Sequence, residues 1–222
     1  MLEALFETYR PAPKYPVYPP YHTGRYLEDF FCDWYYSNDI KTDRVFIPVS
    51  WTTCYIDKKT EGLQDALDKL DPSKKYFTVS QYDDGISQTL PPDTLQFNAG
   101  GNSGGIPIPL VCSKLPVIPG PLDKDIFASF VGSMTHPVRH EMYGHFRGKT
   151  DCFLELKSWS PTVTDDNFYN FISAAMRSKF LLCPRGYGLN SFRLYEAFQL
   201  KCVPVVITDE LFLPWQDELD WS

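Results

Sequence analysis

A short stretch near the C-terminal end of the chain, RGYGLNSFRLYE at residues 185–196, concentrates side chains that bind phosphates and sugar hydroxyls. Arg185 places a cation beside two glycines, and Ser191 can cap a helix whose first N–H groups and dipole would face a phosphate. Glu196, about one turn into that helix, carries two acceptor oxygens that can hold two ribose hydroxyls. The pattern predicts a nucleotide-sugar site whose binding residues are Arg185, Gly186, Tyr187, Ser191, Arg193 and Glu196.

These side chains need a strand before them and a helix and a strand after them. The run FLLCP at 180–184 is short and apolar, and VPVVIT at 203–208 is continuous and rich in valine, as buried parallel strands are. The run SFRLYEAFQL at 191–200 fits a helix between them. The segment therefore predicts strand, glycine loop, helix and strand, with a ligand at the carboxyl ends of the strands.

The same segment resembles the signature of the exostosin-like glycosyltransferases, glycosyltransferase family 47. The matching residues are Cys183, Pro184, Gly186, Ser191, Arg193, Glu196, Ala197, Cys202, Val203, Pro204, Val205 and Asp209. The resemblance implies inverting transfer of a sugar from a UDP-sugar to a hydroxyl of a glycan or glycoprotein. One departure is Lys201, where the family usually has a glycine that ends the helix in a left-handed conformation. Lysine there predicts a modest strain or a different helix end.

A second family-like match is FVGSMTHPVR at residues 130–139. Gly132 after a strand allows the backbone to approach a ligand closely, and Arg139 offers a planar fork suited to a diphosphate. We expect both to bind the donor; the alternative is an ordinary turn with a surface arginine. His136 and His140 flank Arg139 and are not expected to be catalytic.

An inverting transfer also needs a base that takes the proton of the acceptor hydroxyl. The best candidates are Asp83 and Asp84, which follow the expected strand 76–80 and resemble the family's H-D-x-G ending, with Tyr82 in place of the histidine. The alternative is a solvated acidic turn. Further candidates for the acceptor side are His22, Arg25 and Glu28.

Strands and helices alternate in both halves of the chain, around a proline-rich linker at 113–124. We expect strands at 45–49, 76–80, 126–131 and 152–156, and helices at 24–37, 61–70, 165–179 and from the loop after residue 131 through Phe146. This alternation indicates two parallel α/β sheets. The resemblance implies GT-B architecture, two Rossmann-like domains with a cleft between them, here an acceptor-side domain at 1–115 and a donor domain at 116–222. The loop NAGGNSGG at 98–105 lacks the Lys-Ser/Thr ending of a Walker loop, and we expect little functional role for it.

No metal or cofactor is expected. The one D-x-D triplet, at 123–125, precedes a strand instead of ending one, and none of the six cysteines forms a C-x-x-C pair. Arginines and helix dipoles would then stabilise the leaving diphosphate. A net charge of −7 without a basic block argues against a nucleic-acid partner.

The N-terminal residues contain no apolar run that would predict a signal peptide or a membrane anchor. We therefore expect a soluble cytoplasmic form, or a Golgi-lumen domain excised from an anchored enzyme. The short form looks like exostosin-type enzymes of large algal viruses. That likeness slightly favours UDP-xylose over UDP-glucuronic acid, UDP-galactose or UDP-arabinose. Two alternatives stay open: an inactive sugar-nucleotide or glycan-binding partner, and an unrelated nucleotide-binding α/β enzyme, which would want a G-x-G-x-x-G that does not occur.

Overall fold

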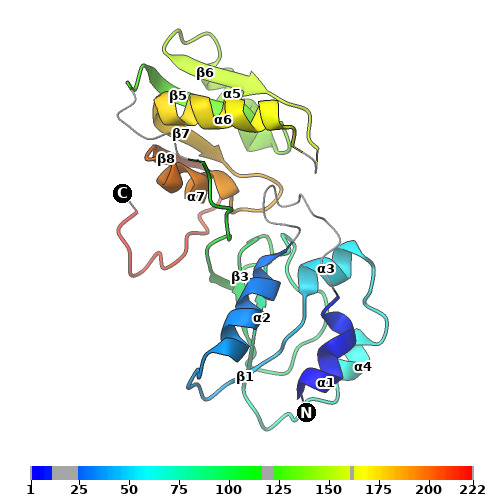
Figure 1. Ribbon diagram of the computed structural model, residues 1–222. Helices are drawn as coiled ribbons and strands as arrows, with labels where there is room; N and C mark the ends of the chain where they lie inside the picture. The colour runs from blue at the N-terminus through cyan, green and yellow to red at the C-terminus, as the bar shows by residue number, and fades with distance from the viewer. Residues whose placement is uncertain (1, 12–24, 117–122, 161–162, 222) are drawn as a thin grey trace. The chain divides into compact units, whose positions relative to one another are not determined.

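The computed structural model describes residues 2–11, 25–116, 123–160 and 163–221. The chain divides into two compact units: one contains the described residues up to Val111 together with the segment from Phe212, and the other contains those from Cys112 to Leu211. Each unit has its own four-stranded sheet in which every paired strand is parallel (Figure 1). The predicted mixed α/β fold with parallel sheets is confirmed.

The sheet of the first unit has the strand order β1-β2-β3-β4. Its strands are β1 Val45–Phe46, β2 Tyr76–Ser80, β3 Leu95–Asn98 and β4 Ile106–Pro107. The helices of this unit are α1 Leu2–Phe6, the 3-10 helix η1 Glu7–Tyr9, α2 Leu27–Ser37, α3 Trp51–Ile56 and α4 Leu63–Leu67. Strand β2 is buried along its whole length, because it lies between two strands and under helices on both faces.

Different side chains cover the two faces of this sheet. Helix α2 stacks Phe31 and Tyr35 on the rings of Phe46 and Phe77, with ring centroids 5.0–6.1 Å apart. On the other face, helices α1, α3 and α4 form a buried cluster with the strands, whose members include Phe6, Trp51, Leu63, Leu67 and Tyr76. The sheet therefore has an apolar core on each face, which leaves its polar chemistry to the strand ends.

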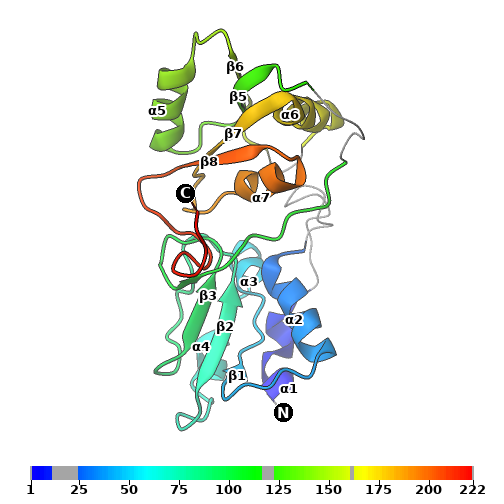
Figure 2. The same ribbon diagram turned by 90° about the vertical axis from the view of Figure 1, so that its left-hand side faces the viewer.

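The sheet of the second unit has the order β6-β5-β7-β8. Its strands are β5 Ile126–Gly132, β6 Cys152–Leu156, β7 Ser178–Pro184 and β8 Val203–Ile207, and its helices are α5 Pro137–Phe146, α6 Asp165–Arg177 and α7 Phe192–Gln199. Helices α6 and α7 cover one face and α5 covers the other (Figure 2). The side chains of β7 alternate accordingly, since Leu181 and Cys183 pack under α6 while Leu182 packs under α5.

Several predicted element bounds need correction. Strand β1 is shorter than the expected 45–49, because the chain leaves the sheet after Phe46 and soon begins α3, a helix that its threonines and aromatic residues do not favour. Helix α2 begins at Leu27 and α4 spans only Leu63–Leu67, so both are shorter than predicted. Helix α6 ends at Arg177 and β7 starts at the next residue, which makes the expected helix 165–179 too long. The short elements α1, β3 and β4 were not predicted.

The strain predicted at Lys201 is confirmed. Lys201 has a φ of 54°, the left-handed conformation that glycine adopts most easily, so lysine here is strained. Cys183 and Cys202 are buried free thiols. Burial raises the pKa of Cys183 to about 12.

Of the helices in the described ranges, none combines the length and the apolar character needed to span a bilayer.

Candidate functional site

The carboxyl ends of β5, β7 and β8 share one edge of the second sheet, and Arg139 joins two of the loops that follow them. From α5, its guanidinium donates to the carbonyl oxygens of Ser133 (2.8 Å), Arg185 (2.8 Å) and Pro184 (3.4 Å). Burial and the nearby charge of Arg193 lower the pKa of Arg139 to about 10, so the group stays charged at neutral pH. Arg139 therefore holds the main chain at this edge, and its contact with a diphosphate stays a prediction.

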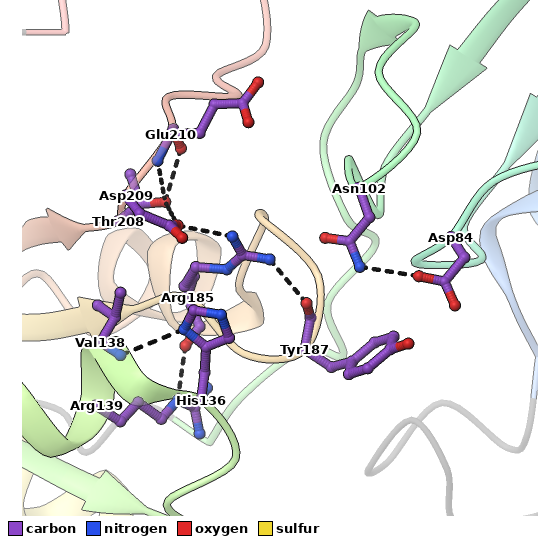
Figure 3. A network of polar contacts seen from close by, with 10 residues as sticks. All are labelled: Asp84, Asn102, His136, Val138, Arg139, Arg185, Tyr187, Thr208, Asp209 and Glu210. Carbon is purple, nitrogen blue, oxygen red and sulfur yellow. Dashed lines mark hydrogen bonds and ion pairs between the residues drawn. The ribbon is translucent and has the colours of Figure 1, made fainter.

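Arg185 is the second cation of this edge, and it comes directly after β7. Its Nη1 lies 2.7 Å from Oδ1 of Asp209, beyond β8, and its Nη2 donates to the carbonyl of Tyr187 at 2.9 Å (Figure 3). The side chain of Arg185 is 10% exposed and that of Asp209 is 53% exposed. The hydrogen bond from Arg185 lowers the pKa of Asp209 below its usual value. The pair fixes a nearly buried cation where the loops of β7 and β8 meet.

The start of α7 supplies the third charged group. Ser191 caps this helix as predicted, accepting from the N–H of Arg193 at 3.4 Å. Arg193 lies 2.6 Å from Oε2 of Glu196, donates to the carbonyl of Val131 at 2.8 Å, and covers the ring of Phe171 at 3.9 Å. The carboxylate of Glu196, our candidate ribose ligand, is thus held in place by a neighbouring cation.

The glycines of this edge make room for side chains. A Cβ on Gly186 would lie 3.2 Å from Nη2 of Arg139, and one on Gly132 would lie 2.8 Å from the ring of Phe130. A larger residue at Gly186 would push Arg139 aside, and one at Gly132 would push the Phe130 ring aside. These two neighbours also contact each other, since the guanidinium of Arg139 lies 5.7 Å from the centre of the Phe130 ring. Tyr187 follows Gly186 and is 61% exposed, so its ring is accessible.

The first unit has a comparable edge, made by the ends of β2 and β3. Asp83 and Asp84 lie in the turn after β2, where Asp83 is half-buried and Asp84 is exposed. Asn102, after β3, donates its N–H to the carbonyl of Asp83 (3.0 Å) and its side-chain amide to Oδ1 of Asp84 (3.1 Å; Figure 3). The ring of Tyr82 packs on that of Tyr55 at 4.8 Å. Hydrogen bonds and ring packing therefore fix the conformation of the acidic turn.

The glycine-rich loop after β3 is what holds this turn. A Cβ on Gly100 would lie 2.4 Å from the Cα of Asp83, and one on Gly85 would lie 1.9 Å from Oγ of Ser103, so the two loops meet backbone to backbone. Asn98 closes the loop by accepting from Gly100 N–H at 2.9 Å and donating to Ser103 Oγ at 2.9 Å. The loop therefore shapes the acidic turn, and the small functional role expected for it stays a prediction.

The other acceptor-side candidates differ from the acidic turn in their burial and their partners. Glu28 is 2% exposed and is buried beneath the start of α2. Arg25 forms an ion pair with Asp33 and covers the ring of Phe30 at 4.6 Å. His22 lies outside the described residues. The structure thus places Glu28 in the interior and pairs Arg25 with a residue of α2.

The D-x-D triplet lies at the wrong end of the second sheet for this site. Asp125 immediately precedes β5 and pairs with Arg177 at the end of α6, at the amino ends of the strands. The pairing lowers the pKa of Asp125. Within the described ranges, no group of three or more His, Cys, Asp or Glu side chains is placed to hold a metal ion.

Two contributors to the second edge had no role in the sequence-based site. Asp209 belongs to the signature, but only the structure pairs it with Arg185. His136 caps α5, accepting from the N–H of Val138 at 3.3 Å through Nδ1 (Figure 3). A Pro following His136 is a helix-start signal that could have identified the cap.

Comparison with known proteins identifies the family of the C-terminal part of the sequence. The sequence profile of the exostosin GT47 domain matches residues 101–222. That span contains the whole described second sheet and its edge residues, and it begins after the acidic turn at Asp83 and Asp84. The match therefore covers the donor-side residues and does not reach the acidic turn, and the roles of both stay predictions.

Curated relatives from plants carry transferase names, and one from an insect is named as an exostosin. A probable glucuronosyltransferase of Oryza sativa subsp. japonica is 34% identical over 125 residues, which is 51% of this chain and 27% of the relative. A probable beta-1,4-xylosyltransferase of Arabidopsis thaliana is 31% identical over 109 residues, 47% of this chain and 26% of the relative. Exostosin-1 of Drosophila melanogaster is 40% identical over 54 residues, 24% of this chain and 7% of the relative. The chain thus spans about a quarter or less of the length of these relatives.

Proposed function

The chain belongs to the exostosin GT47 family of glycosyltransferases, and from that premise we propose that it is an inverting glycosyltransferase that moves a sugar from a UDP-sugar to a hydroxyl of a glycan or glycoprotein. The donor site of this proposal is the carboxyl edge of the second sheet. Its binding residues are Gly132, Arg139, Arg185, Gly186, Tyr187, Ser191, Arg193 and Glu196.

The observation that carries the proposal is the ordered set of cations at that edge. Arg139, Arg185 and Arg193 join the ends of three strands, each through contacts of 2.6–2.9 Å. A leaving UDP gains negative charge as the glycosidic bond breaks, and fixed cations and helix N–H groups stabilise that charge without reorganising. A ribose would bind to Glu196, whose carboxylate Arg193 already orients. Such a set suits a diphosphate leaving group better than a neutral ligand.

The acceptor half of the reaction is assigned to the first unit. We assign the base to Asp83, with Asp84 as its neighbour, because the loop after β3 holds the backbone that carries this side chain. The proposal requires GT-B architecture in the active enzyme, with an acceptor-side domain at 1–115, a donor domain at 116–222 and a cleft between them. A base acting from the face opposite UDP would invert the anomeric configuration.

The proposed transfer needs no metal ion. The arginines of the donor edge supply the positive charge that a bound cation supplies in metal-dependent transferases. The sugar is assigned on relatives alone: their names include xylosyl and glucuronosyl transfer, and we favour UDP-xylose, with UDP-glucuronic acid next. A carboxylated sugar would need a further cation, which makes the two donors separable by experiment.

A panel of UDP-sugars tests this proposal. The protein is incubated with UDP-xylose, UDP-glucuronic acid, UDP-galactose and UDP-arabinose, with and without excess EDTA, and UDP release and the anomer of the product are measured. We expect one donor to be consumed equally well in EDTA and to give the inverted anomer. Retention of configuration would contradict the single displacement, and rescue by Mn²⁺ after EDTA would contradict metal independence. UDP binding without any turnover would identify an inactive partner protein instead.

A further inference from the structure

Glu28 is a buried carboxyl group that connects three elements of the first unit. It lies in the first turn of α2 and is 2% exposed. Its Oε1 accepts from the N–H and the hydroxyl of Thr52 at 3.0 and 2.7 Å, and from the N–H of Gln81 at 3.1 Å. Thr52 belongs to the first turn of α3, and Gln81 is the first residue after β2. One oxygen atom therefore joins the starts of two helices to the end of a central strand.

The two oxygens of this carboxyl group have different surroundings. Oε2 is buried and has no hydrogen-bond partner among the described residues, whereas Oε1 accepts from three donors. A carboxylate spreads its charge over both oxygens, so leaving one of them dry is costly. A protonated acid carries no charge and accepts through its carbonyl oxygen, so leaving its hydroxyl oxygen without a partner costs much less than leaving a carboxylate oxygen dry. Burial raises the pKa of Glu28, in agreement with this asymmetry.

The charged groups on the adjoining elements do not favour ionisation. Asp29 is the next residue on α2, and Asp83 and Asp84 follow Gln81 in the acidic turn. After α3 the carboxylate of Asp57 lies 3.7 Å from Lys59, so that cation is already paired. Cys54 on α3 is a neutral thiol, because burial raises its pKa to about 12.

A second contact closes the link between α2 and β2. The side chain of Gln81 accepts the N–H of Leu27 at 2.9 Å, while the N–H of Gln81 donates to Glu28. The start of α2 and the end of β2 thus clasp each other in both directions. Asp83 lies two residues beyond Gln81, so the clasp fixes the point from which the acidic turn departs.

We propose that Glu28 is an uncharged acid in the folded protein and acts as a positioning residue for the acidic turn that carries Asp83. The structural half of this proposal stands on the contacts of Glu28, and its catalytic half rests on the proposed function. Glu28 itself is sealed from solvent and does not touch the substrate.

Thermal unfolding across pH tests the uncharged state, with Glu28→Gln as the variant that copies a neutral acid. A group whose pKa is raised by folding stabilises the protein fully below its ordinary value of 4.5, and that stability is lost as pH rises through the folded pKa. Above pH 4.5, the difference between the Tm of Glu28→Gln and that of wild type should therefore increase in favour of the variant. The increase should be roughly 3–5 °C for each pH unit over which Glu28 stays protonated in folded wild type. Asp29→Asn, a matched change at the adjacent carboxylate, should keep the wild-type pH dependence. A Tm difference between Glu28→Gln and wild type that does not rise with pH would overturn the uncharged state.

Amide hydrogen exchange tests the positioning role independently of any activity. Glu28→Ala should lower the Tm by roughly 5 °C and speed exchange at residues 80–85 by about tenfold or more, because the Gln81 N–H loses its acceptor. Glu28→Gln should restore the protection, and UDP affinity should be unchanged in both variants. If Glu28→Ala does not fold, amide exchange in Glu28→Gln decides the positioning role. Unprotected amides at 80–85 in Glu28→Gln would contradict the contact between the start of α2 and the end of β2. Normal protection in Glu28→Ala would overturn positioning. Absence of transfer in wild type with these exchange results intact would count against the proposed function alone.

Discussion

The two sheets of this protein end in edges of opposite chemical character. The edge of the second sheet is built from arginines whose guanidinium groups bind carbonyl oxygens and the carboxylates of Asp209 and Glu196. The edge of the first sheet is built from the acids Asp83 and Asp84, held by amides and glycines of the loop after β3. Similar parallel sheets thus present a fixed cation in one unit and a fixed carboxylate in the other. The difference shows that the residues at the strand ends, and not the sheet type, set the chemical character of each edge.

The largest expected effect comes from removing the proposed base. Asp83→Asn keeps the shape of the side chain but is a far poorer proton acceptor, so transfer should fall roughly 10²–10⁴-fold. UDP affinity should not change, because the donor edge lies in the other unit. Steady-state transfer rates and UDP calorimetry on the same samples measure both. Asp84→Asn is the matched control and should lose less, since Asn102 already uses its carboxylate. Near-normal transfer by Asp83→Asn would break the assignment of the acidic edge.

The glycine loop offers a way to disturb the same edge without touching an acid. Gly100→Ala would place a Cβ 2.4 Å from the Cα of Asp83, so the acidic turn must shift. A displacement of this kind should lower transfer by about 10²-fold and leave UDP binding intact. Gly104→Ala is the control: its Cβ would meet nothing within 4 Å, although its φ of 76° is strained for alanine. Equal losses of transfer in the two variants would mean that backbone strain, and not displacement of Asp83, causes the effect.

Arg139 sharpens the comparison from the cationic side. Its three carbonyl contacts indicate that Arg139→Ala should lower the free energy of unfolding, by roughly 1.5–3 kcal/mol for lost charged hydrogen bonds. Denaturant unfolding measures this change. Arg185→Ala should cost turnover chiefly, because its pairing partner Asp209 is half exposed and can be solvated. If Arg139→Ala keeps its stability but loses most of its turnover, Arg139 would act mainly by contacting the diphosphate.

The sequence predicted the second edge better than the first, for physical reasons. Around the signature, apolar runs and a capping serine are local signals, and strands β7 and β8 and the Ser191 cap followed from them. The contacts of Arg139 with Pro184 and Arg185 join residues about 45 positions apart, which no local pattern reveals. In the first unit, β3 and β4 are too short to show a clear period. The fit of Gly100 against Asp83 depends on backbone proximity, so the loop looked merely flexible.

Glu28 illustrates the same limit from another side. Its place in a family-like segment suggested a residue that lines the acceptor, because a glutamate is usually solvent-accessible. In the structure Thr52 and Gln81 approach it from distant parts of the chain and seal it in the interior. Only tertiary packing could turn this candidate ligand into a candidate support.

The most direct test of the central claim is calorimetric titration of UDP into wild type and Glu196→Ala. The account predicts that wild type binds one UDP and that Glu196→Ala weakens the affinity by roughly 1–3 kcal/mol, the cost of leaving hydrogen-bonding partners unpaired. The variant should stay folded, as circular dichroism would verify, and Asp83→Asn should bind UDP like wild type. Equal UDP affinity in wild type and in folded Glu196→Ala would contradict the placement of the donor at the edge of the second sheet.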